Sequence, residues 1–320
     1  MSFEIFFTSK LPVNRKKSLA IIKYSRSISH DDGILSTGLQ EYNGNEIFEV
    51  WNTDENVFYE NINDFDIYKS NNYLFGSRII DMNKSYEDNK IKIISAYNNL
   101  FEITKKEKME IVKIWHFIPE LLSKYDNDKT NYSLLCESRE VVYNSHFNDF
   151  NFPAATAIGI KGKKILIYFF AGRFSKYKAI ENKRQVSSYL YPQEIFKEKP
   201  MFSRAVSFEN LGSGVRKIFI SGTASIKGYK SMHSLDLKEQ LNEALKNYGT
   251  FINLNNNSSN ISRIYITNIK DEDKLWIQQK LEKVFGIGRF IVVKGDICRK
   301  ELIIEVEGVS DEKHKISIKD

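Results

Sequence analysis

The amino-acid sequence predicts an α+β fold made of two similar α/β halves, each a mixed sheet with helices packed on one face. Two observations lead to this prediction. Amphipathic helical segments alternate with short β-branched and aromatic runs from about residue 86 onwards. The order helix, strand, helix and then two strands also occurs twice, in 86–170 and in 236–309. We therefore expect an internal duplication, with an N-terminal domain at 1–178 and a C-terminal domain at 179–320.

The first 80 residues contain short apolar runs that predict strands and carry no chemistry beyond packing. The predicted strands are 3–7, 19–24, 47–51 and 73–80. An Asn- and Asp-rich stretch that ends at Asp66 separates the last two strands and is expected to be a loop.

The first repeat begins with a helix at 86–104, in which apolar side chains recur at helical spacing: Ile91, Ile94, Tyr97 and Phe101. Next come a strand, a second helix with Thr130 as its N-cap, and two further strands, at 111–118, 130–147, 154–160 and 164–170. The glycine-containing turn at 161–163 joins the last two strands in the way typical of a hairpin.

The second repeat follows the same order. A strand at 217–221 precedes an amphipathic helix at 236–251, whose apolar stripe consists of Leu237, Leu241, Leu245 and Tyr248. A strand, a helix and a closing pair of strands complete the repeat, at 261–269, 271–285, 290–294 and 301–309. The boundary between the halves is expected in the polar stretch from Gly172 to Glu181.

The composition is that of an ordinary globular protein and excludes several classes of function. The net charge of +6, from 47 basic and 41 acidic residues, is spread along the chain, so it indicates an anionic small molecule at most and no nucleic-acid partner. The two cysteines, Cys136 and Cys298, form no disulfide framework, and no Cys or His spacing suggests a metal site. No N-terminal signal and no apolar run of about 18 residues is present, so we expect a cytoplasmic location and no membrane partner.

A dense run of Arg, Tyr and small polar residues lies between the halves and suggests a site for carboxylates. The run contains two arginines and two tyrosines: Arg184, Tyr189, Tyr191 and Arg204. Guanidinium groups bind carboxylates bidentately, and phenols add neutral hydrogen bonds. Small residues then end a strand, where backbone can approach a ligand closely: Ser221, Gly222, Thr223 and Ala224. Each feature alone is also typical of packing, of surface charge or of an ordinary turn.

Near the C-terminus, alternation over 302–306 predicts a strand with two acidic residues on one face. Leu302, Ile304 and Val306 share one face, and Ile303, Glu305 and Glu307 share the other. A carboxyl group beside an isoleucine is either a solvated edge residue or an acid held in a partly apolar pocket.

Several stretches resemble known protein families. Over 201–309, the motifs at 202–205, 218–223 and 304–307 are similar to the RidA/YjgF fold, which is chorismate-mutase-like. Longer motifs resemble the chorismatases, which are two-domain enzymes with a RidA-like catalytic half: 114–119, 152–173, 182–192, 221–226 and 296–299. The resemblance implies a degenerate RidA-like domain in the N-terminal half and a RidA-like catalytic domain in the C-terminal half.

The resemblance also implies a reaction, the cleavage of the enol ether of chorismate without a metal or an organic cofactor. The products would be pyruvate and either a hydroxybenzoate or a dihydroxycyclohexadiene carboxylate. Glu305 matches the family's proton donor, and Glu307 on the same face is the alternative. Protonation of the vinyl CH₂ carbon begins the cleavage, and a carboxylic acid can do this at neutral pH only if its pKa is raised.

For the substrate carboxylates we expect Arg139 and Arg204, with Tyr189 or Tyr191 as a phenol partner. The other expected substrate contacts are Arg184, Ser221, Gly222, Thr223, Ala224 and Arg299. Two departures from the family's pattern, Ser138 before Arg139 and His116 in place of the usual Asn, concern the shape of the pocket more than the reaction.

Cys298 is assigned a catalytic role, and a buried small hydrophobic residue is its alternative. In the family, Gly with Cys resembles the pattern of 3-hydroxybenzoate formation, and Ala without Cys resembles that of simple hydrolysis. Ala224 with Cys298 is a mixed pair. We favour 3-hydroxybenzoate, because the thiol lies near the acid where the chain enters the strand.

Two other functions fit part of the sequence. A RidA-type imine or enamine deaminase would bind a carboxylate through Arg289, after Gly288, and orient water with Glu305, but it would leave the first half and the run 184–192 unexplained. A non-catalytic small-ligand binder is the third hypothesis, because a fold alone never excludes it. We expect either a monomer, in which the duplicated halves satisfy each other's contacts, or a homotrimer like those of single RidA-like domains.

Overall fold

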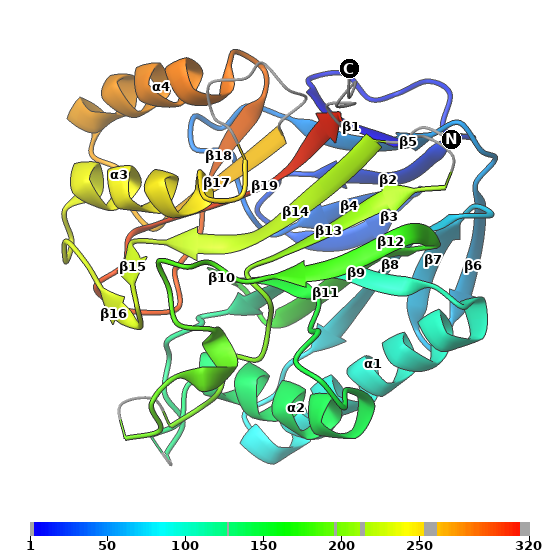
Figure 1. The fold of residues 1–320 in the computed structure, drawn as a ribbon, viewed down its shortest axis with the longest axis horizontal. Helices are drawn as coiled ribbons and strands as arrows, with labels where there is room; N and C mark the ends of the chain where they lie inside the picture. Colours follow the sequence, from blue (N-terminus) through cyan, green and yellow to red (C-terminus); the bar gives the residue numbers. More distant parts are fainter. Residues whose placement is uncertain (1–2, 127, 195–196, 212–214, 253–260, 314–320) are drawn as a thin grey trace, which may run out of the picture.

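The structure is a computed structural model that describes residues 3–126, 128–194, 197–211, 215–252 and 261–313. Three large sheets and one small two-stranded sheet make up its β structure. The helices lie on the outside of the molecule, and the large sheets face one another between them (Figure 1).

The first sheet is formed by the N-terminal residues and has the strand order β1-β5-β2-β4-β3. The strands are Phe3–Thr8 (β1), Ser18–Lys23 (β2), Ile28–Asp31 (β3), Ile34–Thr37 (β4) and Phe48–Thr53 (β5). The predicted strands at 3–7, 19–24 and 47–51 are confirmed. The four-residue strands β3 and β4 are absent from the prediction, because they are too short and too polar to show a β pattern.

The second sheet has the order β10-β9-β11-β8-β7-β6. Its strands are Phe58–Ile62 (β6), Phe65–Lys69 (β7), Tyr73–Asp81 (β8), Glu110–Pro119 (β9), Ala154–Ile160 (β10) and Lys164–Gly172 (β11). Its helices are Tyr86–Glu107 (α1) and Asn131–His146 (α2). Thr130 caps α2 as predicted, and its side chain and that of Ser133 form a reciprocal capping box.

The third sheet has the order β12-β13-β14-β19-β17-β18. Its strands are Phe174–Ile180 (β12), Ala205–Asn210 (β13), Val215–Ala224 (β14), Ile261–Ile266 (β17), Phe290–Lys294 (β18) and Ile304–Lys313 (β19). Its helices are Leu237–Tyr248 (α3), which Asp236 caps, and Asp271–Phe285 (α4). The short strands Ile226–Lys227 (β15) and Lys230–Ser231 (β16) pair with each other, and Ser188–Leu190 forms one 3₁₀ turn.

The second and third sheets have the same topology. Read from the other edge, the second sheet runs β6-β7-β8-β11-β9-β10, which matches β12-β13-β14-β19-β17-β18 strand for strand. In both sheets the pair that flanks the second helix is parallel, β9 with β10 and β17 with β18. The two α+β repeats of the prediction are therefore confirmed. The N-terminal five-stranded sheet belongs to neither repeat.

The predicted hairpins at the end of each repeat are wrong. β10 pairs with β9 and not with β11, although Gly162 does make the turn between them with a positive φ of 116°. In the same way β17 lies between β18 and β19. A short connection between two strands is compatible with a hairpin. Here, however, β9 lies between β10 and β11, and β17 lies between β18 and β19.

Two predicted irregular segments also contain strands. β6 and β7 form a hairpin in the Asn- and Asp-rich stretch before Asp66, and the two turn residues have the left-handed φ values of a type I′ turn, 51° for Asn63 and 63° for Asp64. β12 occupies the polar stretch at 172–181 as an edge strand that pairs with β13. The predicted domain boundary between residues 178 and 179 falls inside β12, and the division into two domains stays a prediction.

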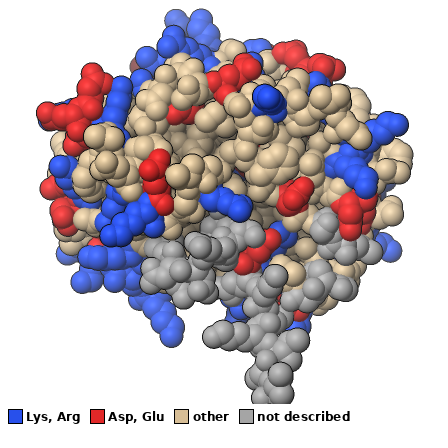
Figure 2. Space-filling model, turned by 90° about the horizontal axis from the view of Figure 1, so that it is seen from above, with Lys and Arg blue, Asp and Glu red and all other residues tan. Residues whose placement is uncertain are grey.

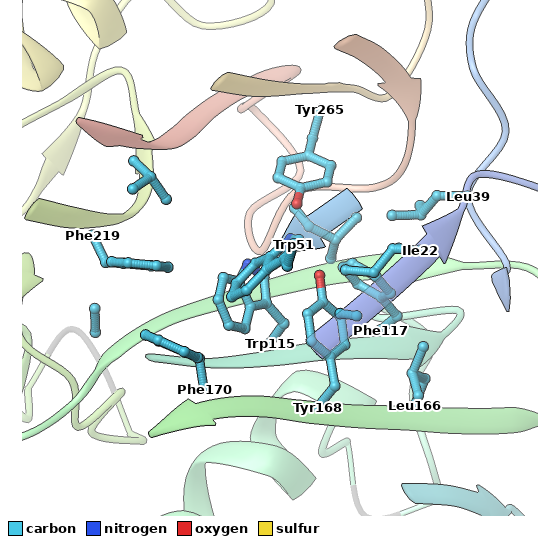
Figure 3. Close-up of a cluster of buried hydrophobic side chains, with 14 of the residues drawn as sticks. Ile22, Leu39, Trp51, Trp115, Phe117, Leu166, Tyr168, Phe170, Phe219 and Tyr265 are labelled. Carbon is cyan, nitrogen blue, oxygen red and sulfur yellow. The ribbon is translucent and has the colours of Figure 1, made fainter. Parts of the chain in front are cut away.

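The main core forms where the three large sheets meet. Trp51 of the first sheet packs edge-on against Trp115 of the second at a ring distance of 5.7 Å, and against Phe219 of the third at 5.8 Å. Tyr168 and Tyr265 extend into the same cluster from the second and third sheets (Figure 3). Two further cores lie between each repeat's sheet and its own helices. The inner faces of the repeat sheets are therefore buried against the N-terminal sheet and against each other.

The surface offers no concentrated charge on the face shown in Figure 2, where basic and acidic side chains are interspersed among neutral ones. Among the residues that the structure describes, no α-helix has the length and apolar character that a membrane span requires.

Candidate active site

A cavity of about 390 Å³ is lined by residues of both repeats. This volume lies within the roughly 300–1,000 Å³ of sites that bind small molecules. Eight of the predicted site residues line it: Arg139, Tyr191, Arg204, Gly222, Ala224, Cys298, Arg299 and Glu305. The second repeat supplies the acid, and α2 of the first repeat supplies Arg139. The first repeat is therefore part of the site and not only a support for it.

Glu305 is a buried acid that lies at the wall of the cavity. Its residue is 5% exposed, and no hydrogen bond to its carboxyl group is found among the described residues. Burial, and then the neighbouring charge of Glu307, raise the pKa of Glu305 to about 8, while Lys113 and Arg204 act in the opposite direction. The Glu305 carboxyl group is thus protonated at neutral pH and able to donate its proton.

A bulge in β14 makes the room for this side chain. The register between β14 and β19 shifts between Ile220 and Thr223, so Ser221 and Gly222 lie in the bulge. A Cβ atom on Gly222 would lie 1.8 Å from Oε1 of Glu305. The position therefore requires glycine, because any side chain would displace the acid.

Ser221 and Thr223 shape the bulge and do not line the cavity. The Ser221 hydroxyl donates to the Ser203 carbonyl at 2.6 Å and accepts from the Ala155 amide at 2.9 Å. The Thr223 hydroxyl donates to the Ser221 carbonyl at 2.8 Å. Both side chains are buried, and their hydrogen bonds hold the strand and its neighbours in place.

Glu307 is an ionised carboxylate bound by five donors. Trp115 and the Nη1 atom of Arg263 donate to it at 3.0 and 2.7 Å, and Lys113, Thr156 and Tyr265 also contact its oxygens. Despite its complete burial, Lys113 and then Arg263 lower the pKa of Glu307 to about 2. Glu307 cannot donate a proton at neutral pH, so the geometry favours Glu305 over this alternative.

Two buried guanidinium groups face the cavity. Arg139 is 1% exposed, and in the described part of the chain no carboxylate pairs with it and its Nε atom has no hydrogen-bond partner. Arg204 is 3% exposed; its Nη2 atom donates to the Val186 carbonyl and to the Tyr191 hydroxyl at 2.9 and 2.8 Å, and its Nε atom is also without a partner. Glu181 accepts from the backbone amide of Arg204 at 3.3 Å and interacts with its charge, whereas Arg139 has no acidic partner among the described residues. A buried cation without a counter-ion is costly, so Arg139, with Arg204 beside it, is arranged to receive an anion.

Tyr191 and not Tyr189 is the phenol at the site. The Tyr191 ring lies beside the guanidinium groups of both Arg204 and Arg299, at 5.8 and 5.6 Å. Tyr189 instead stacks on Phe150 at 4.6 Å, outside the cavity. Arg299 lines the cavity while it donates to the Tyr229 carbonyl at 3.0 Å.

Arg184 lies away from the cavity. Its Nε atom donates to the Asn247 side chain at 2.8 Å, and its Nη2 atom contacts the carboxylate of Glu243. This arginine joins the segment after β12 to α3 in the described structure. Its side chain has its own acidic partner and needs none from a ligand.

The Cys298 thiol lines the cavity in its neutral form. Burial, and then the proximity of Glu305, raise its pKa to about 12. A thiol at this pKa is not a nucleophile at neutral pH. Cys298 and Ala224, which is opposite Glu305 in the strand register, limit the space beside the acid.

Several residues of the cavity were missed in the sequence. Thr156 of β10 donates to Glu307 and accepts from the Gly222 amide at 3.0 Å, so it connects Glu307 to the bulge beside Glu305. Tyr132, Ser133 and Phe202 also line the cavity. Phe202 and Thr156 lie within motifs that the resemblance used but were not singled out there, whereas Tyr132 and Ser133 belong to an ordinary helical pattern that carries no functional signal.

In the described part of the chain, no group of three or more His, Cys, Asp or Glu side chains is placed to hold a metal ion. The cavity combines one protonated carboxyl group, one fixed carboxylate nearby, and two buried guanidinium groups. This set suits acid catalysis on an anionic molecule.

Comparisons with known proteins show which proteins this chain resembles. The family model described as chorismatase FkbO/Hyg5-like, N-terminal, matches residues 49–171. A 3-hydroxybenzoate synthase of Streptomyces hygroscopicus is 30% identical over 230 residues, which cover 67% of this chain and 68% of that protein. A chorismatase of Streptomyces rapamycinicus is 26% identical over 211 residues, which cover 62% of this chain and 63% of that protein.

Among solved structures, a crystal structure of a chorismatase matches with a TM-score of 0.84. The match covers 97% of this chain and 98% of that chain at 22% sequence identity. At this identity the likeness shows a common fold, and it includes the N-terminal sheet as well as both repeats.

Proposed function

This chain belongs to the chorismatase family, and from that premise we propose that it cleaves the enol ether of chorismate, releasing pyruvate and a hydroxybenzoate. The observation that carries the proposal is the contrast between two carboxyl groups on β19. Glu305 is held protonated in the cavity and Glu307 is held ionised behind it. The site thus has a general acid ready at neutral pH, and protonation of an enol ether needs one.

In the first step Glu305 transfers its proton to the vinyl CH₂ carbon of chorismate. The C=C electron pair forms the new C–H bond, and the ether oxygen shares its lone pair with the adjacent carbon, which gives an oxocarbenium ion. Arg139 and Arg204 hold the two carboxylates of the substrate, with Tyr191 beside Arg204. The ionised Glu305 is left beside the cation and stabilises it.

In the second step an oxygen nucleophile, either water or the 4-hydroxyl of the substrate, attacks the oxocarbenium carbon. When water attacks, the resulting hemiketal breaks the bond between this carbon and the ring ether oxygen; the hemiketal hydroxyl loses its proton to become the pyruvate carbonyl, and the ring oxygen gains a proton. The ionised Glu305 accepts the proton that the nucleophile loses, so the acid is restored at each turnover. Net addition of water gives pyruvate and a dihydroxycyclohexadiene carboxylate. Attack by the substrate's own 4-hydroxyl gives a cyclic ketal; its C4–O bond then breaks as the ring loses the C3 proton and becomes aromatic, and the resulting hemiketal releases pyruvate and 3-hydroxybenzoate with no net uptake of water.

We favour 3-hydroxybenzoate as the ring product. Cys298 and Ala224 both line the wall beside Glu305, and the buried neutral thiol keeps this wall apolar. An apolar wall disfavours an entering water molecule relative to attack by a group of the substrate itself. Cys298 then acts by shaping the cavity and excluding water, not by forming a covalent bond.

The deaminase alternative depends on Arg289 as a carboxylate-binding residue, and the position of Arg289 does not support this role. Arg289 is exposed and lies outside the cavity, between α4 and β18. The cavity instead takes its guanidinium groups from Arg139 and Arg204. A non-catalytic ligand binder would have no use for a carboxyl group kept protonated at the wall of its site.

We also propose that the enzyme acts as a monomer. The two repeats bury their inner faces against the N-terminal sheet and against each other, so these faces need no second copy of the chain to cover them. A homotrimer is the other arrangement that we considered. Sedimentation velocity of the full chain distinguishes them, and a mass of three chains would contradict the monomer.

The purified protein, incubated with chorismate, tests the proposed function. Pyruvate release is followed with a coupled lactate dehydrogenase, and the ring product is identified by chromatography against 3-hydroxybenzoate, 4-hydroxybenzoate and the dihydrodiol. Pyruvate formation no faster than the spontaneous rate would refute the proposal. Release of ammonia from an imino acid would support the deaminase instead.

Glu305→Gln tests the role of the acid. The variant should fold, because glutamine has the shape of a protonated glutamate, and kcat should fall by at least ~10²-fold, the usual scale for the loss of a general acid. Circular dichroism and the pyruvate assay measure the two outcomes. Activity close to that of the wild type would exclude Glu305 as the proton donor.

A further inference from the structure

Four buried charges form a row that crosses all three large sheets. Glu49 lies on β5 of the N-terminal sheet, Arg263 on β17, Glu307 on β19 and Lys113 on β9, and none is more than 3% exposed. Arg263 donates to Glu49 from Nε at 2.6 Å and to Glu307 from Nη1 at 2.7 Å. Lys113 contacts Glu307 on the other side. The signs alternate along the row, and its charges sum to zero.

Glu49 is tied to this row by more than its ion pair. The Tyr24 hydroxyl and the Trp51 indole donate to its carboxylate at 2.6 and 2.5 Å. Trp51 lies at the centre of the core where the three sheets meet (Figure 3). The N-terminal sheet therefore delivers one carboxylate, with two neutral donors, to a cation that belongs to the second repeat.

Stability alone does not explain four charges in such a place. Burial of ion pairs costs so much desolvation energy that apolar residues of similar volume are often equally stable or more so. The row does, however, end at the site. Glu307 is two residues from the acid on the same face of β19, and Thr156 connects it to the bulge at Gly222.

We propose that Glu49 is a positioning residue for catalysis: it offsets the charge of Arg263, so that Glu307 presents a net negative charge to Glu305. The inference rests on the proposed function. Without the charge of Glu49 the row would carry a net charge of +1, and an ionised Glu305 would be stabilised. The N-terminal sheet thereby takes part in the reaction without reaching the cavity.

The charged and titratable groups around Glu305 and Glu49 determine how the protonation of Glu305 depends on pH. Those around Glu305 are Glu307, Lys113, Arg204 and Cys298. Those around Glu49 are Tyr24, Trp51, Tyr168 and Arg263. Glu307 raises the pKa of Glu305, after burial, and Lys113 lowers it. The balance between the anion and the cations of the row thus acts directly on the acid.

The test is the pH dependence of kcat/KM for chorismate in Glu49→Gln. Because only protonated Glu305 is active, the rate falls as pH rises through its pKa. Burial lowers the pKa of Lys113 to about 8, so Lys113 titrates over the same range, and an infrared titration of Glu305 assigns the limb. We expect this high-pH limb to move to lower pH by roughly 0.5–1 unit, the scale of one buried charge acting through an effective dielectric constant of about 20. Loss of activity at every pH with an unmoved limb would show a merely structural role and overturn the proposal.

Two further variants separate charge from packing. Glu49→Asp keeps the charge and should leave the limb where the wild type has it. Glu41→Gln is the matched control, because Glu41 is also a buried glutamate of the N-terminal segment but accepts only from the amides of Asn43 and Asn45. A limb that moves equally in Glu41→Gln would also overturn the proposal.

If Glu49→Gln does not fold, the double variant Glu49→Gln/Arg263→Met decides. Both charges leave together, so no unpaired buried charge remains between them. We expect Arg263→Met alone to move the limb to higher pH, and the double variant to return it towards the wild-type position. Identical limbs in the double and the single variant would refute the role of Glu49.

A measurement that does not depend on turnover can test the role of Glu49 separately from the proposed reaction. The carbonyl stretch of the Glu305 carboxyl group can be titrated by infrared difference spectroscopy, with Glu305→Gln as the reference for each variant. A shift of this titration in Glu49→Gln supports the inference even if chorismate is not the substrate. A wild type that releases pyruvate, with a titration that Glu49→Gln does not move, defeats the inference alone.

Discussion

Glu305 and Glu307 lie two residues apart on one face of β19, and their surroundings give them opposite protonation states. Glu307 is held by Lys113, Arg263 and three neutral donors, so the ionised form is stable in spite of burial. Glu305 has burial and a neighbouring anion but no donor among the described residues. Two carboxyl groups with separated pKa values are the usual arrangement by which one site obtains an acid and a fixed charge.

The raised pKa of Glu305 predicts how stability depends on pH. Its pKa is about 8 in the folded protein against 4.5 for the free side chain. Between these values the unfolded chain has lost the proton and the folded one keeps it, so stability falls as pH rises from about 4.5 to 8. Glu305→Gln should remove this dependence and unfold with a free energy higher than that of the wild type by roughly 4 kcal/mol at pH 8.

Urea denaturation of the wild type and of Glu305→Gln at pH 4.5 and at pH 8 measures this difference. The two proteins should have nearly equal stability at the lower pH. A difference of the same size at both pH values would mean that the acid is not protonated in the folded state.

Gly222 is predicted to be the residue whose substitution harms the acid most directly. In Gly222→Ala the new Cβ would meet Oε1 of Glu305 at 1.8 Å, so the carboxyl group must turn away from the cavity. We expect kcat to fall by at least ~10²-fold, comparable to loss of the acid itself. Adding Glu305→Asp, which shortens the acid by one methylene, should restore part of the rate. A further loss in this double variant would contradict the steric explanation.

At the scale of elements, Arg139 on α2 and Arg184 after β12 were both predicted to bind substrate, but the structure gives them different surroundings. Arg139 is buried without a carboxylate partner among the described residues, whereas Arg184 is paired with Glu243. Arg139→Met should raise KM for chorismate by ~10-fold or more, since a charge-assisted hydrogen bond contributes about 1.5–3 kcal/mol. Its stability should not decrease, because the lost cation was unpaired.

Arg184→Met is the matched control for Arg139→Met. It removes a half-exposed ion pair with α3, so its midpoint of thermal unfolding should fall slightly while KM stays within about 2-fold of the wild type. Equal increases of KM in the two variants would show that the structure separates them wrongly. Steady-state kinetics and thermal unfolding of both variants provide the comparison.

The elements that the sequence predicts best are those with a strong local pattern. α4, β10 and β18 begin and end at the predicted residues, and α2 begins at its predicted cap. Pairing is not a local property. Gly162 predicts a turn correctly, yet the strand it leads to is separated from β10 by β9. The β6–β7 hairpin was missed because its turn residues, Asn63 and Asp64, have the composition of a loop.

At the scale of the whole molecule, the buried charges join the three sheets where their apolar cores also meet. Lys113 of the second sheet contacts Glu307 of the third and also donates to the Ile220 carbonyl, so it fastens the repeats to each other. Lys113→Met should lower the free energy of unfolding by about 3–5 kcal/mol, the usual cost of leaving one partner of a buried pair. Chemical denaturation measures it.

Lys113→Met/Glu307→Gln is the control for this prediction. Removal of both charges should recover part of the lost stability, because the uncompensated carboxylate is gone. A double variant that is less stable than Lys113→Met by the full effect of Glu307→Gln alone would mean that the two residues contribute independently.

The sequence by itself determined the two α+β repeats, the strand that carries Glu305 and Glu307, and eight of the residues that line the cavity. These follow from periodicity, from capping residues and from motifs that resemble a known family, and all of them are local in the chain. Only the tertiary structure shows that Glu305 is protonated and Glu307 ionised at neutral pH, because a pKa depends on partners such as Lys113 and Arg263 that are distant in sequence. Contacts distant in sequence also explain why Arg184 is paired with Glu243 and Arg139 is not, and why Glu49 meets Arg263.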